Sequence, residues 1–140
     1  MDQSIELFGE EDTDRINNCR EWLVGHYDDA TLYESIDGKL NLIQTILDKG
    51  WVNVDETWKL QSLGVAFGDA LVQEVDELVW VMVEDEFGRD PALQWLSTNV
   101  LTFPLTSISK RIEDGDTVDV KQLFVGFQRA ISGAVNNAGR

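Results

Sequence analysis

Apolar residues recur at intervals of three and four along most of the chain, the spacing of one face of an α-helix. The first such segment begins after Asp12 or Thr13 and ends near Gly25. Ser35 and Gly50 bracket the second, in the positions of a helix N-cap and of the residue after a C-terminus. Three further helices are expected to begin at Asp55, Pro104 and Asp119.

The spacing of apolar residues ceases to be helical at Leu78. The run 78–83 is continuously apolar and rich in β-branched residues, which predicts a strand buried on both faces. Turn-forming residues fill 84–91, so residues 92–96 are expected to return antiparallel, with a third strand at 98–103. In the third predicted helix, Gly64 and Gly68 are four residues apart and predict close approach by another element.

These elements predict an α+β fold, with about five helices packed around a short antiparallel three-stranded meander. The chain length of 140 residues fits one domain. We place a single globular domain at residues 12–134, preceded by a mobile acidic lead-in at 1–11 and followed by a frayed tail at 135–140.

Charge narrows the choice of partner. The chain has 26 Asp and Glu against 11 Lys and Arg, a formal charge of −15 that repels nucleic acids and anionic membranes. No signal-like or membrane-spanning run is present in the sequence, and Cys19 is the single cysteine, so we expect a cytoplasmic protein. A basic protein partner fits this charge, although solubility explains it equally well.

No catalytic set emerges from the remaining residue types. His26 is the sole histidine and is better explained as a cap at the end of the first helix. One Cys and one His cannot supply an ordinary zinc site, and the acidic loop 114–119 lacks the spacing of an EF-hand. Glycine-rich phosphate loops are absent from the sequence as well. We therefore predict no catalytic residue, no cofactor and no metal.

The acidic residues after the predicted central strand are the main candidates for a surface. Glu84, Asp85, Glu86 and Asp90 are expected at a hairpin, where a solvated turn is a simpler explanation than catalysis. Of the five tryptophans, most are expected in the core, whereas Trp95 lies within the less regular stretch 94–97 and is the candidate for a partly exposed anchor.

Three segments also carry a family resemblance: 63–71, 80–93 and 103–112, in that order. Over residues 55–127 the chain resembles a bacterial family known as domain of unknown function thirty-eight-oh-six. The resemblance implies an α+β domain and no established activity. Polar or small residues within these segments suggest an ion-pair network about the hairpin. They are Gly68, Asp69, Glu84, Asp85, Arg89, Lys110 and Arg111.

The hypothesis that follows is a non-enzymatic, acidic protein-binding module, more specifically an immunity protein that masks a basic toxin or effector. Its contact surface is predicted at Glu84, Asp85, Glu86 and Asp90, with Trp95 nearby. The alternative is a small-molecule binder or a carboxylate-dependent hydrolase centred on Asp69, Glu84 and Asp85. A subunit of a homo-oligomer is the third candidate.

Overall fold

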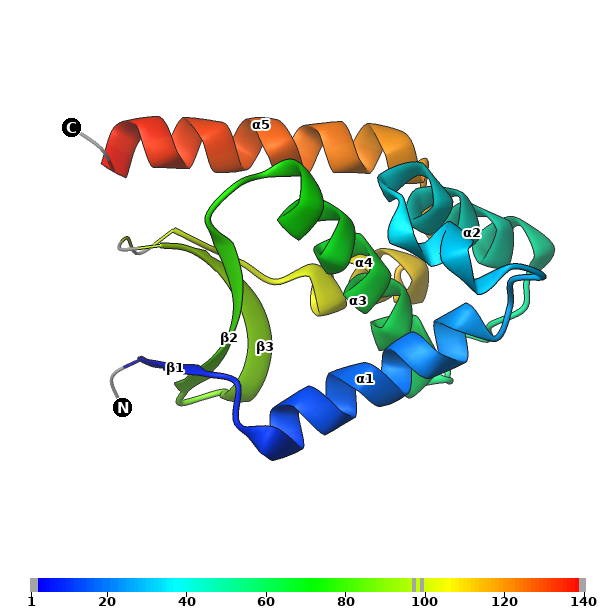
Figure 1. Cartoon of the computed structure of the whole chain (residues 1–140), viewed down its shortest axis with the longest axis horizontal. Coiled ribbons are helices and arrows are strands. Elements are labelled where there is room, and N and C mark those ends of the chain that lie inside the picture. The colour runs from blue at the N-terminus through cyan, green and yellow to red at the C-terminus, as the bar shows by residue number, and fades with distance from the viewer. Residues whose placement is uncertain (1–2, 97, 99, 139–140) are drawn as a thin grey trace.

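The elements of the chain run in the order β1, α1, a short 3₁₀ helix η1, α2, α3, β2, β3, β4, α4 and α5 (Figure 1). The computed structural model describes residues 3–96, 98 and 100–138. Its helices are α1 Glu10–Val24, η1 Ala30–Glu34, α2 Ile36–Lys49, α3 Thr57–Glu74, α4 Pro104–Glu113 and α5 Val120–Ala138. Its strands are β1 Ser4–Leu7, β2 Leu78–Asp85, β3 Gly88–Trp95 and β4 Leu101–Thr102. The α+β class with five α-helices is thereby confirmed.

The sheet has four strands in the order β1-β2-β3-β4, with antiparallel neighbours throughout. The predicted meander corresponds to β2, β3 and β4, although β4 is shorter than expected. The extra strand β1 lies in the predicted mobile lead-in and pairs with the far half of β2, Ile5 opposite Val83. At the other end, α5 continues to Ala138, so the predicted frayed tail is helical as far as the structure describes it.

Local signals position most helix ends. The Ser35 hydroxyl accepts from the backbone N–H of Gly38 at 2.9 Å, and Gly50 has the left-handed φ of 65° that glycine tolerates after a helix. Helix α1 begins earlier than predicted, because Gly9 is its N-cap. Asp12 lies in the first turn and its carboxylate accepts from the Gly9 N–H at 2.9 Å.

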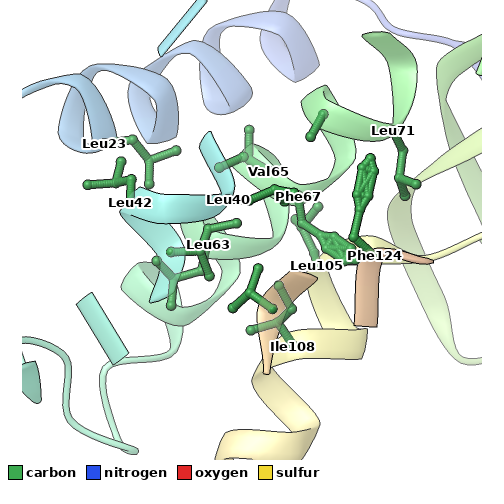
Figure 2. Packing of buried hydrophobic residues seen from close by; sticks show 14 of the residues in the cluster. Leu23, Leu40, Leu42, Leu63, Val65, Phe67, Leu71, Leu105, Ile108 and Phe124 are labelled. Atoms are coloured by element: carbon green, nitrogen blue, oxygen red, sulfur yellow. The ribbon is translucent and has the colours of Figure 1, made fainter. Parts of the chain in front are cut away.

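Helix α3 runs through the centre of the main core, between α1, α2, α4 and α5 (Figure 2). Its two glycines allow the close approach that their spacing predicts. A Cβ on Gly64 would lie 2.4 Å from the Cα of Leu105 in α4, and one on Gly68 would lie 2.4 Å from the ring of Trp80 in β2. Both positions therefore require glycine for packing rather than for an unusual φ.

The sheet carries apolar residues on both faces, as predicted for β2. Leu78 and Leu93 belong to the helical core. Because side chains alternate along a strand, Val81, Val83 and Ala92 point to the opposite face, where they form a second cluster. Half-buried Ile5, Leu101 and Phe103 pack against that second cluster. Within the described residues, none of the helices has the length and hydropathy to span a bilayer.

Candidate functional site

The β2–β3 turn consists of Glu86 and Phe87, because Asp85 pairs directly with Gly88. The turn is tighter than the predicted 84–91 segment, and β3 begins before Pro91. One oxygen of Asp85 accepts from the N–H of Phe87 at 2.8 Å, which fixes the turn. Phe87 projects from it with 88% of its surface exposed.

The four predicted acids gather near this turn but on different sides of the sheet. Glu84 lies opposite Arg89, on the face that carries Trp80. Asp85 and Asp90 share the other face as diagonal neighbours, which are about 7 to 8 Å apart in antiparallel pairs. We call Glu84, Asp85, Glu86 and Asp90 the acidic hairpin surface. Its centre is the exposed Phe87, which was not among the residues predicted from the sequence.

An ion pair fastens the hairpin to the first helix. Both terminal nitrogens of Arg89 contact the Asp12 carboxylate, at 2.6 and 2.9 Å. Hydrogen bonds from Arg89 and from the Gly9 N–H hold the pKa of Asp12 at about 2, below its ordinary value of 3.8. The charge of Arg89 is therefore paired with Asp12 and does not neutralise the four acids of the acidic hairpin surface.

Trp95 does not belong to the acidic hairpin surface. It pairs with Leu78 at the opposite end of β3, seven residues from Gly88, or about 24 Å at about 3.4 Å per residue. It is half-buried and packs against the main core. The exposed tryptophans are instead Trp51 and Trp58, at 51% and 45%, and the other three pack against the main core.

Asp69 of α3 is the most densely hydrogen-bonded carboxylate among the described residues. Arg20 donates to both of its oxygens, at 2.8 and 2.7 Å, while the hydroxyl of Tyr33 and the indole N–H of Trp80 donate at 2.6 and 3.0 Å. This contact raises the pKa of Arg20, and burial together with the Asp69 charge raises the pKa of Tyr33. The arrangement joins α1, η1, α3 and β2.

Lys39 borders this network. Its ammonium donates to the side-chain oxygen of Gln73 and lies 4.8 Å from the ring centre of Tyr33, and burial lowers its pKa. Gln73 in turn donates to the carbonyl of Glu34 at 2.8 Å. Among the described residues, no buried side-chain nitrogen or oxygen is left without a partner. The network is internally satisfied, which suits a structural role.

Two of the residues suggested for an ion-pair network about the hairpin form ion pairs, each with a residue outside the suggested set. Asp69 pairs with Arg20 and Arg89 with Asp12, whereas Lys110 and Arg111 form no ion pair among the described residues. Asp69 is also separated from Glu84 and Asp85, which lie beyond Trp80 toward the turn. These three carboxylates line none of five surface cavities found along the described residues.

His26 closes the first helix, as expected. Its Nδ1 lies 2.9 Å from the carbonyl oxygen of Trp22 in the last turn of α1. The imidazole ring also stacks on Trp51 and meets the edge of Trp22. Cys19 is buried on the inner side of the same helix. Among the described residues, no three His, Cys, Asp or Glu side chains are grouped as they would be to hold a metal ion.

The fold and these sites define an α+β domain, and comparison with known proteins identifies its family. The model of the family described as "Domain of unknown function (DUF3806)" matches residues 39–124, more than half of the chain. The chain therefore belongs to this family. The match begins in α2, earlier than the resemblance at residues 55–127 suggested.

A solved structure from Bacteroides thetaiotaomicron VPI-5482 has a similar fold. Its TM-score is 0.74 at 17% sequence identity, over 94% of this chain. The likeness covers 48% of that chain, so the present chain spans about half of its length. The comparison with curated proteins gives no match. These likenesses establish the family and the fold and carry no activity.

Proposed function

We propose that this chain is an acidic protein-binding module whose acidic hairpin surface contacts a basic protein. The observation that carries the proposal is the turn itself: an almost fully exposed Phe87 at the tip of the hairpin that carries the acidic hairpin surface. Exposed aromatic side chains are frequent anchors of protein interfaces. Acidic side chains around such an anchor favour encounter with a positively charged partner.

Two further observations support a binding role for the hairpin. The ion pair between Arg89 and Asp12 fixes the hairpin against α1. A hairpin that is already fixed loses less conformational entropy when it binds a partner. The formal charge of −15 steers basic partners over longer distances. The specific form we propose is an immunity protein, which inserts the acidic hairpin surface into the basic active site of a toxin or effector and blocks it.

The test uses a pair of variants with equal changes of charge. Glu86→Lys with Asp90→Lys alters the acidic hairpin surface at two exposed side chains. Asp114→Lys with Asp116→Lys makes the same change in the α4–α5 connection, which lies at the opposite end of the molecule in Figure 1. The tagged full chain, each variant and Phe87→Ala are expressed in the native host, cross-linked and purified at low and high salt.

We expect one basic protein whose recovery falls about tenfold or more in the hairpin variant and in Phe87→Ala, because each loses a contact of the interface. Its recovery with the control variant should equal that of the wild type. For the immunity role, the wild type should inhibit the activity of the captured partner, whereas the hairpin variant should leave that activity uninhibited. Equal loss with both charge variants, or no partner that depends on Phe87, would exclude the proposed surface.

A further inference from the structure

A groove runs between β4 and the middle of α5, away from the acidic hairpin surface. Its cavity has a volume of about 370 Å³. The apolar walls are formed chiefly by Leu101 of β4 and by Leu123, Phe127 and Ile131 of α5. This volume falls within the range of about 300 to 1,000 Å³ that is usual for small-molecule sites. We call this cavity the α5 groove.

Small residues leave room along the helix. Gly126, Ala130 and Ala134 line the α5 groove at intervals of four residues, so they form one row on the helix surface. The row is about 12 Å long, at about 1.5 Å per residue. Apart from its chain neighbours and the adjacent backbone of α5, a Cβ on Gly126 would have no atom within 4 Å among the described residues, so the space above it is open. Gly126 has no packing requirement of the kind found at Gly64.

The positively charged side chain of Arg111 lines the α5 groove. Arg111 of α4 lines both this cavity and an adjoining one of about 310 Å³. One terminal nitrogen donates to the carbonyl oxygen of Ser107 at 2.7 Å. Among the described residues no carboxylate pairs with Arg111, whereas Arg20 and Arg89 each hold a carboxylate with two nitrogens. Asp119 borders the adjoining cavity, but its carboxylate caps α5 by accepting from the N–H of Gln122.

We propose that the α5 groove binds a small amphipathic monocarboxylate, with its apolar tail along the row of small residues and its carboxylate on Arg111. A guanidinium group matches the two oxygens of a carboxylate, and such charged hydrogen bonds are stronger than neutral ones. The apolar walls disfavour a wholly polar ligand. A polyanion is disfavoured by the charge of −15, and a cation by Arg111 itself.

The experiment compares three probes of equal chain length, decanoate, 1-decanol and decylamine. Decanoate and decylamine are used below their critical micelle concentrations and 1-decanol below its solubility limit in water. Backbone amide shifts of the full-length ¹⁵N-labelled protein report the location, and titration gives the Kd. Gly126→Leu should fill the groove without displacing a neighbour, because its Cβ position is open. Gly133→Leu is the matched control, since its Cβ position on the same helix is also open and it does not line the groove.

Decanoate is expected to shift the amides of Leu101, Gly126 and Ala130, and to bind about tenfold more tightly than decanol, as one charged hydrogen-bond pair provides. Arg111→Gln should remove this tenfold difference. Gly126→Leu should abolish binding and Gly133→Leu should not. If Gly126→Leu does not fold by circular dichroism, Ala130→Leu, at an exposed position in the same row, replaces it.

Several results would overturn the proposal. Equal affinity for decanoate and decanol would show that Arg111 does not select a carboxylate. Tighter binding of decylamine would show that the overall acidity of the chain decides. Unchanged decanoate binding in both groove-filling variants would place the ligand elsewhere, and the absence of shifts with any probe would leave no site. Because none of these readouts involves the hairpin, the outcome is independent of the proposed protein partner.

Discussion

Asp69 is the residue on which the packing of four elements converges. Its side chain is 12% exposed, and its carboxylate receives hydrogen bonds from Arg20, Tyr33 and Trp80. A partly buried carboxylate with this many donors stabilises a fold chiefly because its removal leaves the donors unpaired. The role of Asp69 is therefore best tested through stability.

We expect Asp69→Asn to lower the free energy of unfolding by about 2 to 3 kcal/mol, because the amide cannot hold the Arg20 guanidinium with two oxygens. This loss is smaller than that for a fully buried ion pair, since the Arg20 side chain is 32% exposed. Urea denaturation measures the change. Asp14→Asn, at an exposed position of α1, should change the stability by less than about 0.5 kcal/mol. An Asp69→Asn variant as stable as Asp14→Asn would contradict the role assigned to Asp69.

Sequence alone could not identify this network. Arg20 and Tyr33 are 49 and 36 residues from Asp69 along the chain, and no spacing rule connects them. The acids of the hairpin were predictable, because turn residues follow directly on an apolar strand. The exposure of Phe87 was not, because an aromatic residue within a charged turn has no periodic neighbours that would assign it a face. Only the two-residue turn makes it project.

At the scale of elements, glycine sets how closely α3 and α4 approach. Gly64→Ala should destabilise the protein by about 1 to 3 kcal/mol, because the added methyl group meets the backbone of Leu105 and Pro104, which cannot rotate away. Gly126→Ala is the control. It adds a methyl group to open space within α5 and should stabilise the chain by about 0.5 to 1 kcal/mol. Chemical denaturation separates the two, and equal effects of both changes would refute the packing role of Gly64.

The ion pair between Arg89 of the hairpin and Asp12 of α1 should make the stability of the protein depend on pH. The pKa of Asp12 is lowered from 3.8 to about 2, so its contribution to stability is complete above about pH 4 and is lost as the pH falls toward about 2. The variant Arg89→Gln lacks the main cause of this shift. Over that interval its free energy of unfolding should therefore fall less steeply than that of the wild type.

Urea denaturation at pH 6 and pH 3 measures the two slopes. Arg129→Gln, at an exposed position of α5, controls for the loss of one positive charge. Parallel curves for the wild type and Arg89→Gln would show that the ion pair does not hold the pKa of Asp12 down.

Elements were easier to predict than their ends or their partners. Five helices follow from apolar periodicity, and Ser35, Gly50 and Pro104 mark their ends through local backbone chemistry. Strand β1 was missed because four residues, largely exposed, show no pattern until β2 provides their partner. The start of β3 was missed because Pro91 indicates a turn. It is tolerated in the strand because β4 pairs only with Leu93 and Gln94 and leaves that edge free.

For the molecule as a whole, the excess of negative charge opposes folding through self-repulsion. Composition gives the charge of −15, but it does not tell how many charges are paired. Within the described residues three ion pairs form, Arg20–Asp69, Lys59–Glu56 and Arg89–Asp12. Salt has two opposite effects on stability. It weakens the repulsion among unpaired acids, which stabilises the fold, and it weakens the attraction within ion pairs, which destabilises the fold.

Repulsion should dominate this balance, since three ion pairs stand against an excess of 15 negative charges and two of the pairs are substantially exposed. We therefore expect sodium chloride to stabilise the protein. Between about 10 mM and about 300 mM salt, the Debye length falls from about 30 Å to below 10 Å. Over this range the Tm should rise by several degrees, which corresponds to a gain of about 1 kcal/mol in the free energy of unfolding.

Thermal unfolding followed by circular dichroism gives the Tm, and choline chloride at equal ionic strength tests whether the effect is screening or specific sodium binding. The variant Glu86→Lys with Asp90→Lys reduces the net charge by four, so its Tm should depend less on salt than that of the wild type. The control variant Asp114→Lys with Asp116→Lys should show a similar reduction, because long-range repulsion depends mainly on total charge. A Tm that falls with salt would mean that the three ion pairs outweigh the repulsion, and the acidity of the chain would then oppose folding less than its charge implies.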